Sequence, residues 1–219
     1  MAANTVNDTP GAQSRTLLSH QKLKALQPEL YSARSWRKFL RENGYRLSSP
    51  DEDAEHWKDY VAENLQRGDC EAATVVSDSP LLIAAYASEL DCVAMLSFPV
   101  QFAAKYDLNP GSRLLAVNIY LEWNFFLPED LTPGPGQTGK YRNFAPLIAE
   151  FLTDDAEIIE HRKTEITKDE WRRAEALGNE YLKQNGEKAR DGRPLLCHLP
   201  AKAAKTAKAA KAPARTKRR

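Results

Sequence analysis

Gly134, Gly139 and Lys140 have the Gly-x4-Gly-Lys spacing of a phosphate-binding loop. Such a loop wraps backbone N–H groups around the phosphates, places a lysine on the terminal phosphates and needs a Ser or Thr hydroxyl for Mg²⁺. Here Tyr141 stands at the hydroxyl position, and Pro135 removes one N–H group from the cradle. The residues before this segment also lack the pattern of a buried strand. We therefore interpret the segment as a surface loop that binds no nucleotide.

The remaining titratable residues form no recognisable catalytic or metal-ligating pattern. The carboxylate pairs Asp51/Asp53 and Asp154/Asp155 could do acid–base work, but helix capping explains the first pair and a turn the second. The four histidines are far apart in the sequence, and neither Cys-x-x-Cys nor His-x3-His occurs. We predict no catalytic residue, no metal and no cofactor. These residues argue against an enzyme, although an enzyme of unrecognised type is kept as a second alternative.

An aromatic-rich segment runs into a long stretch of Pro and Gly residues. Trp123, Phe125 and Phe126 precede residues 128–143, whose composition predicts a long loop. Exposed aromatic side chains are typical of a protein-binding surface, although the same residues could end a strand inside the core, which we favour. Partner binding through residues 122–143, with these three aromatic residues as contacts, is therefore the alternative functional hypothesis.

Positive and negative charges are segregated along the chain, although its formal net charge is +1. Residues 15–46 carry eight basic and two acidic side chains, whereas residues 51–71 carry eight acidic and two basic ones. A basic helix in the first segment could bind nucleic acid. Because the two oppositely charged segments are adjacent, we favour pairing between them instead.

Residues 201–219 form a separate basic tail with no acidic residue. Its only apolar side chains are Ala and Pro, so it cannot build a core and is predicted to be disordered. Its cations can neutralise phosphates and release counterions, which binds DNA or RNA without reading base sequence. The predicted nucleic-acid-binding residues are Lys202, Lys205, Lys208, Lys211, Arg215, Lys217, Arg218 and Arg219.

The tail resembles the Lys/Ala/Pro-rich tails of linker histones and of histone-like bacterial proteins. The resemblance covers about 19 residues, concerns composition alone and carries no catalytic residue. It implies contact with nucleic acid. A solubilising extension without a dedicated partner is the other interpretation, and an anionic membrane is disfavoured because no hydrophobic anchor accompanies the charges.

Periodicity and capping signals predict the elements that must position these residues. Apolar residues at helical spacing predict helices over residues 33–43, 50–67, 100–107, 145–152 and 168–184. Short apolar runs and alternating patterns predict strands over residues 72–76, 81–86, 92–98, 113–122 and 157–164. Residues 194–199 could form an edge strand or a docked terminal segment.

We therefore predict an α+β fold with a small, mostly antiparallel sheet, an N-terminal helical pair and C-terminal helices. Residues 1–14 are expected to be disordered, residues 15–200 to form a single domain, and residues 201–219 to be the disordered tail. The N-terminus has no apolar signal segment and three cysteines are too few for a disulfide framework, so we expect a cytoplasmic protein that does not enter membranes. The leading functional hypothesis is a non-enzymatic binding or accessory protein whose tail contacts nucleic acid without sequence specificity.

Overall fold

The computed structural model describes residues 12–43, 50–121 and 127–201, without the side chains of residues 50–53. Four helical elements come first along this part of the chain, and the strands follow with further helical elements between them. The helical elements are α1 (His20–Leu26), η1 (Pro28–Tyr31), α2 (Ala33–Glu42), α3 (Pro50–Arg67), α4 (Gln101–Lys105), η2 (Ala149–Phe151), α5 (Ala156–Glu165) and α6 (Lys168–Asn185). The strands are β1 (Asp69–Asp78), β2 (Leu81–Ala87), β3 (Cys92–Phe98), β4 (Arg113–Leu121), β5 (Asn143–Ile148) and β6 (Arg190–Asp191).

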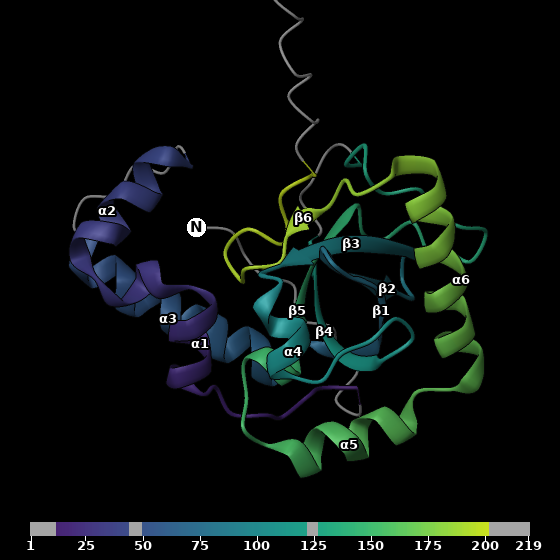
Figure 1. The fold of residues 1–219 in the computed structure, drawn as a ribbon, viewed down its shortest axis with the longest axis horizontal. Coiled ribbons are helices and arrows are strands. Elements are labelled where there is room, and N and C mark those ends of the chain that lie inside the picture. Colours follow the sequence, from purple (N-terminus) through teal and green to yellow (C-terminus); the bar gives the residue numbers. More distant parts are fainter. Residues whose placement is uncertain (1–11, 44–49, 122–126, 202–219) are drawn as a thin grey trace, which may run out of the picture.

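The strands of the described residues form one six-stranded sheet in the order β5-β4-β1-β2-β3-β6. The sheet curls strongly into a half-barrel (Figure 1). β1, β2 and β3 form the predicted antiparallel meander, and β4 and β5 add to it on the other side of β1, also antiparallel. The short β6 pairs with β3 in parallel, so the sheet is mixed. The predicted α+β class is confirmed.

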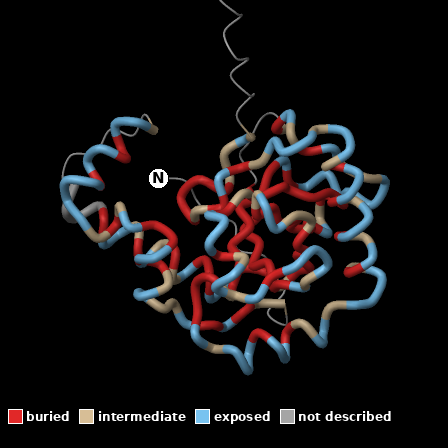
Figure 2. Tube along the Cα trace, viewed as in Figure 1, coloured by how far each residue is buried: buried red, intermediate tan, exposed pale blue. Residues whose placement is uncertain are grey.

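Helix α6 covers the outer face of the half-barrel. Leu82, Ala84 and Met95 project from that face and pack in one cluster with Trp171 of α6. Gly178 lets the helix approach closely, because a Cβ atom there would overlap the Ala84 side chain. The larger cluster of buried apolar residues lies on the inner face and around β4. Figure 2 shows this buried centre enclosed by exposed helices.

Capping explains why α6 begins where it does. The Thr167 hydroxyl accepts a hydrogen bond from the Glu170 backbone N–H at 3.2 Å. The Glu170 carboxylate in turn accepts one from the Thr167 backbone N–H at 2.7 Å. This reciprocal pair is the capping box that the sequence predicts.

The helical arm, residues 20–43, comprises α1, η1 and α2 and packs beside α3. Ser19 and Ser32 cap α1 and α2 by accepting hydrogen bonds from backbone N–H groups three residues later. Trp36 and Phe39 stack with their ring centroids 5.3 Å apart and are buried on the inner side of α2. The N-terminal region therefore holds three α-helices and a 3-10 turn, where the sequence predicts a helical pair.

The predicted helix over residues 145–152 is wrong, because Asn143–Ile148 is strand β5. A short, continuously apolar run carries no periodicity that separates a helix from a buried strand. Pro146 is tolerated in the strand because β5 is an edge strand, with β4 as its one neighbour in the described sheet.

The predicted strand over residues 157–164 is also wrong, because Ala156–Glu165 is helix α5. The adjacent β-branched residues Ile158 and Ile159 suggest a strand, but both lie within this helix, with Ile159 buried and Ile158 exposed. Ion pairs three residues apart support the helix: Lys163 pairs with Glu160 at 2.9 Å, and Arg162 with Glu165 at 2.7 Å.

The remaining predicted elements lie close to their expected positions. The helices over residues 33–43 and 50–67 and the first four predicted strands are present with ends shifted by a few residues. Residues 194–199 form a docked, largely buried turn. In the described ranges, no helix is long and apolar enough to cross a membrane.

Candidate functional site

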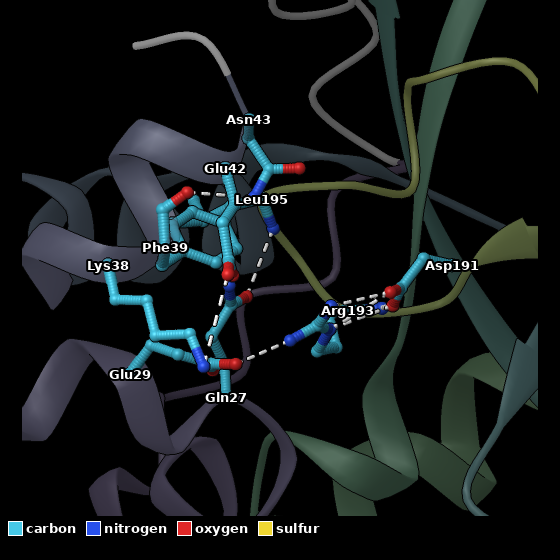
Figure 3. A network of polar contacts seen from close by, with 9 residues as sticks. All are labelled: Gln27, Glu29, Lys38, Phe39, Glu42, Asn43, Asp191, Arg193 and Leu195. Carbon is cyan, nitrogen blue, oxygen red and sulfur yellow. Dashed lines mark hydrogen bonds and ion pairs between the residues drawn. The ribbon is translucent and has the colours of Figure 1, made fainter. Parts of the chain in front are cut away.

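A groove of about 500 Å³ lies on the surface between the helical arm and the β6 end of the sheet. Figure 3 shows the polar network beside it. Most of its lining residues are apolar, and a few are polar or charged, as in many ligand sites. The lining residues are Asn43, Ser97, Phe98, Pro99, Ala189, Asp191, Arg193, Leu196, Leu199 and Pro200.

Arg193 ties the helical arm to the sheet at this groove. Its Nε and Nη2 atoms donate to the Asp191 carboxylate at 3.0 and 2.7 Å, and its Nη1 atom donates to Glu29 at 2.6 Å (Figure 3). The hydrogen bonds that it donates to Asp191 raise the pKa of Arg193 further above its ordinary value. The guanidinium also lies 5.8 Å from the Phe39 ring centroid. Arg193 therefore acts as a clamp whose donors already have carboxylate partners.

Two buried polar atoms beside the clamp have no hydrogen-bond partner among the described residues. The Gln27 side chain accepts a hydrogen bond from the Leu195 backbone N–H at 3.2 Å, but its Nε2 atom has no acceptor. The Oε2 atom of Glu29 likewise has no donor. One orphan donor and one orphan acceptor suit a water molecule or an amide group.

The inner face of the half-barrel is polar at the end where β1 begins. Glu71 is buried there, and its Oε1 atom accepts hydrogen bonds from the hydroxyls of Tyr120 at 2.5 Å and Ser88 at 2.8 Å. Its Oε2 atom accepts the Ser88 backbone N–H at 2.8 Å. Burial raises the pKa of Glu71 to about 7, although these hydrogen bonds favour the charged form.

Asp69 and Asn118 lie directly opposite each other in the β1–β4 register, next to Glu71. Burial, with a smaller contribution from Glu89, raises the pKa of Asp69 to about 7. The Oδ1 atoms of Asp69 and Asn118 are both buried without a donor among the residues that the structure describes. The Asn118 amide donates to the Tyr86 carbonyl at 2.6 Å. A protonated Asp69 carboxyl group would provide one hydrogen-bond donor for these two Oδ1 atoms.

Two carboxyl groups with pKa values near 7 are candidates for proton transfer at neutral pH. The exposed fraction is 8% for Glu71 and 3% for Asp69, so a substrate would need an opening to reach either group. The pair therefore fits a buried structural network better than an open acid–base site. The sequence signal was available, because acidic residues alternate with the apolar positions of β1, but the predicted strand began after them.

The loop between β4 and β5 is fixed to the β2–β3 turn by Asp91. The Asp91 carboxylate accepts hydrogen bonds from Arg173 at 2.9 and 2.8 Å, from the Tyr86 hydroxyl at 3.0 Å and from the Gly136 backbone N–H at 3.1 Å. These bonds, led by those from Arg173, lower the pKa of Asp91. Thr138 adds a hydrogen bond to the Glu89 side chain at 2.9 Å.

The Gly-x4-Gly-Lys segment in this loop is not followed by a helix, as a phosphate-binding loop would be. Strand β5, and no helix, follows Lys140, whose ammonium lies 4.9 Å from the Tyr141 ring centroid. The loop instead surrounds a hollow of about 380 Å³. That hollow is lined by Leu127, Pro133, Gln137, Thr138, Gly139, Tyr141 and Arg142.

Arg190 joins the two edges of the half-barrel. Its Nε and Nη2 atoms donate to Asp130 at 2.7 and 3.1 Å. Its Nη1 atom donates to the Asn143 side chain and to the carbonyls of Phe144 and Cys197 at 3.1 to 3.3 Å. The Arg190 side chain is fully buried. A buried guanidinium with this many acceptors holds β6 against β5.

The cysteines and the C-terminal histidine lie in environments that keep them neutral. Burial raises the pKa values of Cys70, Cys92 and Cys197 to about 12 each, which makes them poor nucleophiles at neutral pH. Burial also lowers the pKa of His198 to about 4. Within residues 12–43, 50–121 and 127–201, no group of His, Cys, Asp and Glu side chains is arranged to hold a metal ion.

The predicted contact residues lie outside the described part of the chain. This holds for the three aromatic residues Trp123, Phe125 and Phe126, and for the eight tail cations Lys202, Lys205, Lys208, Lys211, Arg215, Lys217, Arg218 and Arg219. Both predictions therefore stay predictions. The groove and the buried carboxyl groups are sites that the sequence did not predict.

The described ion pairs of α2 and α3 lie within each helix. Lys38 of α2 is 3.9 Å from Glu42 of the same helix. In α3, Lys58 pairs with Glu55 at 2.5 Å, and a second pair joins residues 63 and 67 at 2.8 Å. The acidic side chains of residues 51–53, which were expected to pair with α2, lie outside the description.

Comparison of the chain with protein-family models, with curated proteins and with solved structures gives no match. Function is therefore inferred from the residues themselves.

Proposed function

We propose that this chain is a non-enzymatic binding or accessory protein that its basic tail holds on nucleic acid. One observation carries the proposal: residues 201–219 contain eight cations and no acid, whereas residues 1–200 contain 23 basic and 30 acidic residues, a net charge of −7. An acidic body repels a polyanion at long range, so the attraction must come from segregated cations. Lysines on a flexible chain reach phosphates but present no fixed geometry to base edges, so binding is independent of base sequence.

The test is binding of a short mixed-sequence DNA duplex at low salt, measured by fluorescence anisotropy. The full-length protein is compared with a variant in which all eight tail cations are changed to Gln. We expect the variant to bind about 100-fold more weakly or worse, because the phosphate contacts supply most of the non-specific affinity.

The matched control is a full-length protein whose tail residues are shuffled, which keeps composition and charge. It should bind as tightly as the natural protein. Equal affinity of the natural and Gln-substituted proteins would contradict the proposal, and so would loss of binding on shuffling.

A second candidate function is protein binding through the loop of residues 127–142. The hollow of about 380 Å³ in this loop, together with the hydrogen bonds that fix the loop to Asp91 and Glu89, supports it, because a preorganised surface loses little entropy on binding. A partner isolated with the natural protein should be lost on Gln137→Arg, which fills the hollow. Retention of the partner by that variant would exclude this site.

A further inference from the structure

The outer face of α2 carries a stripe of exposed cations. Arg34, Arg37, Lys38 and Arg41 are all exposed, and they follow the spacing i, i+3, i+4 and i+7, which places them on one side of a helix. Over these residues the helix rises about 10 Å. That length corresponds to about three nucleotides along one strand of a DNA duplex.

The apolar residues of α2 face the opposite way and hold the helix on the protein. Trp36, Phe39 and Leu40 are at most 5% exposed and belong to the main core cluster. The apolar packing that holds the helix is therefore on the side away from the stripe. Figure 1 shows α2 at the side of the molecule away from the sheet, so a long polyanion could reach the stripe beside the acidic body.

The acidic side chains of the helical arm are neutralised by other residues. Glu29 is paired with Arg193 at 2.6 Å, and Glu42 lies 3.9 Å from Lys38. Both partners of the second pair are more than half exposed, so this pair is weak and leaves Lys38 able to contact a phosphate. The arm thus presents a net positive surface next to a body of opposite charge.

Arg34 stands in the first turn of α2, where a cation is unfavourable. The positive end of the helix dipole favours acidic residues there, yet the first turn of α2 holds none. Helix stability therefore does not explain a cation at this position, whereas a contact with phosphate would use its charge.

We infer that the α2 stripe is a second contact for the phosphate backbone of nucleic acid, acting together with the tail. This inference rests on the proposed function, and it adds a helical surface to the cations of the tail. A helix that is packed on the body orients that body on the duplex. The contact is electrostatic, so its signature is the salt dependence of binding.

The experiment is a salt titration of duplex binding by full-length Arg34→Gln/Lys38→Gln/Arg41→Gln. Arg37 is kept because it also has a contact within the protein. If all three cations meet phosphates of B-form DNA, the slope of log K against log salt should become flatter by about 2.7. Circular dichroism establishes that the variant is folded.

The matched control is Lys168→Gln/Arg172→Gln/Lys183→Gln on α6. Like the α2 set, it comprises an exposed cation in the first turn, a member of an ion pair within the helix and an exposed cation in the last turn. It removes the same charge and should leave the slope unchanged. Equal flattening by both triple variants would show an effect of net charge alone and would overturn the inference.

The outcomes separate this inference from the proposed function. If the α2 variant keeps the slope of the natural protein and neutralising the tail abolishes binding, the inference about the stripe is wrong and the proposal about the tail stands. If binding persists when the tail is neutralised but is lost when the α2 cations are changed, the stripe is the contact and the proposal about the tail is wrong. If the natural protein binds neither a DNA nor an RNA duplex at low salt, both are wrong.

Discussion

Glu71→Gln should remove a large part of the dependence of stability on pH. Glu71 is buried against Tyr120 and Ser88, and burial raises its pKa to about 7 from an ordinary value of 4.5. Between these two pH values the folded protein holds a proton that the unfolded chain has released. The stabilisation is therefore complete below about pH 4.5, and it is lost as the pH rises through about 7.

The magnitude follows from the size of the shift. One pKa unit corresponds to about 1.4 kcal/mol, so the full shift amounts to about 3 kcal/mol, most of which falls between pH 5 and pH 8. Gln has the same shape and stays neutral, and its amide oxygen can still accept hydrogen bonds from the hydroxyls of Tyr120 and Ser88. The free energy of unfolding of Glu71→Gln should therefore fall by about 2 to 3 kcal/mol less than that of the natural protein over this range.

The assay is urea unfolding followed by tryptophan fluorescence at several pH values from 5 to 8. Glu175→Gln, which removes an exposed glutamate of α6, controls for the loss of one negative charge. Parallel pH profiles for the natural protein and Glu71→Gln would refute the reasoning, because they would mean that Glu71 titrates alike in the folded and unfolded states.

Three further predictions concern the closure of the sheet, the thiols and the cap of α6. Arg190→Ala should lower the free energy of unfolding by about 3 to 5 kcal/mol in urea titrations, because it leaves the buried Asp130 carboxylate unpaired; an unchanged midpoint would contradict the role of this contact. Cys92 and Cys197 should resist a thiol reagent at neutral pH until the protein unfolds, since both are buried with pKa values of about 12; rapid labelling of the native protein would argue against this. Thr167→Ala should reduce the free energy of unfolding by about 1 kcal/mol in the same urea assay, and no change would mean that the capping box is dispensable.

The sequence predicted elements whose signals are local. Helix α6 was predicted because Thr167 and Glu170 form a capping box within four residues, and the α2 helix because its apolar residues recur at helical spacing. Strand β5 and helix α5 were assigned to the wrong class. The first is a short apolar run without periodicity, and in the second two adjacent Ile residues outweighed the helix-forming Glu, Lys and Arg residues.

The candidate sites depend on contacts between residues far apart in the sequence, and local sequence patterns do not predict such contacts. Arg190 meets Asp130, 60 residues earlier, and Arg193 meets Glu29, 164 residues earlier. The raised pKa of Glu71 likewise depends on burial under strands that pair far along the sequence. The charge segregation that carries the proposed function could be read from the sequence, because net charge needs no knowledge of the fold.

The salt dependence of duplex binding is the most direct test of the proposal that the basic tail holds this protein on nucleic acid. The natural protein and the full-length variant with its eight tail cations changed to Gln are titrated with salt on two DNA duplexes of unrelated sequence. If all eight cations engage B-form DNA, the two proteins should differ in the slope of log K against log salt by about 7, and each should bind both duplexes alike. Equal slopes for the two proteins, or a strong preference for one duplex, would contradict a tail that holds this protein on nucleic acid by charge alone.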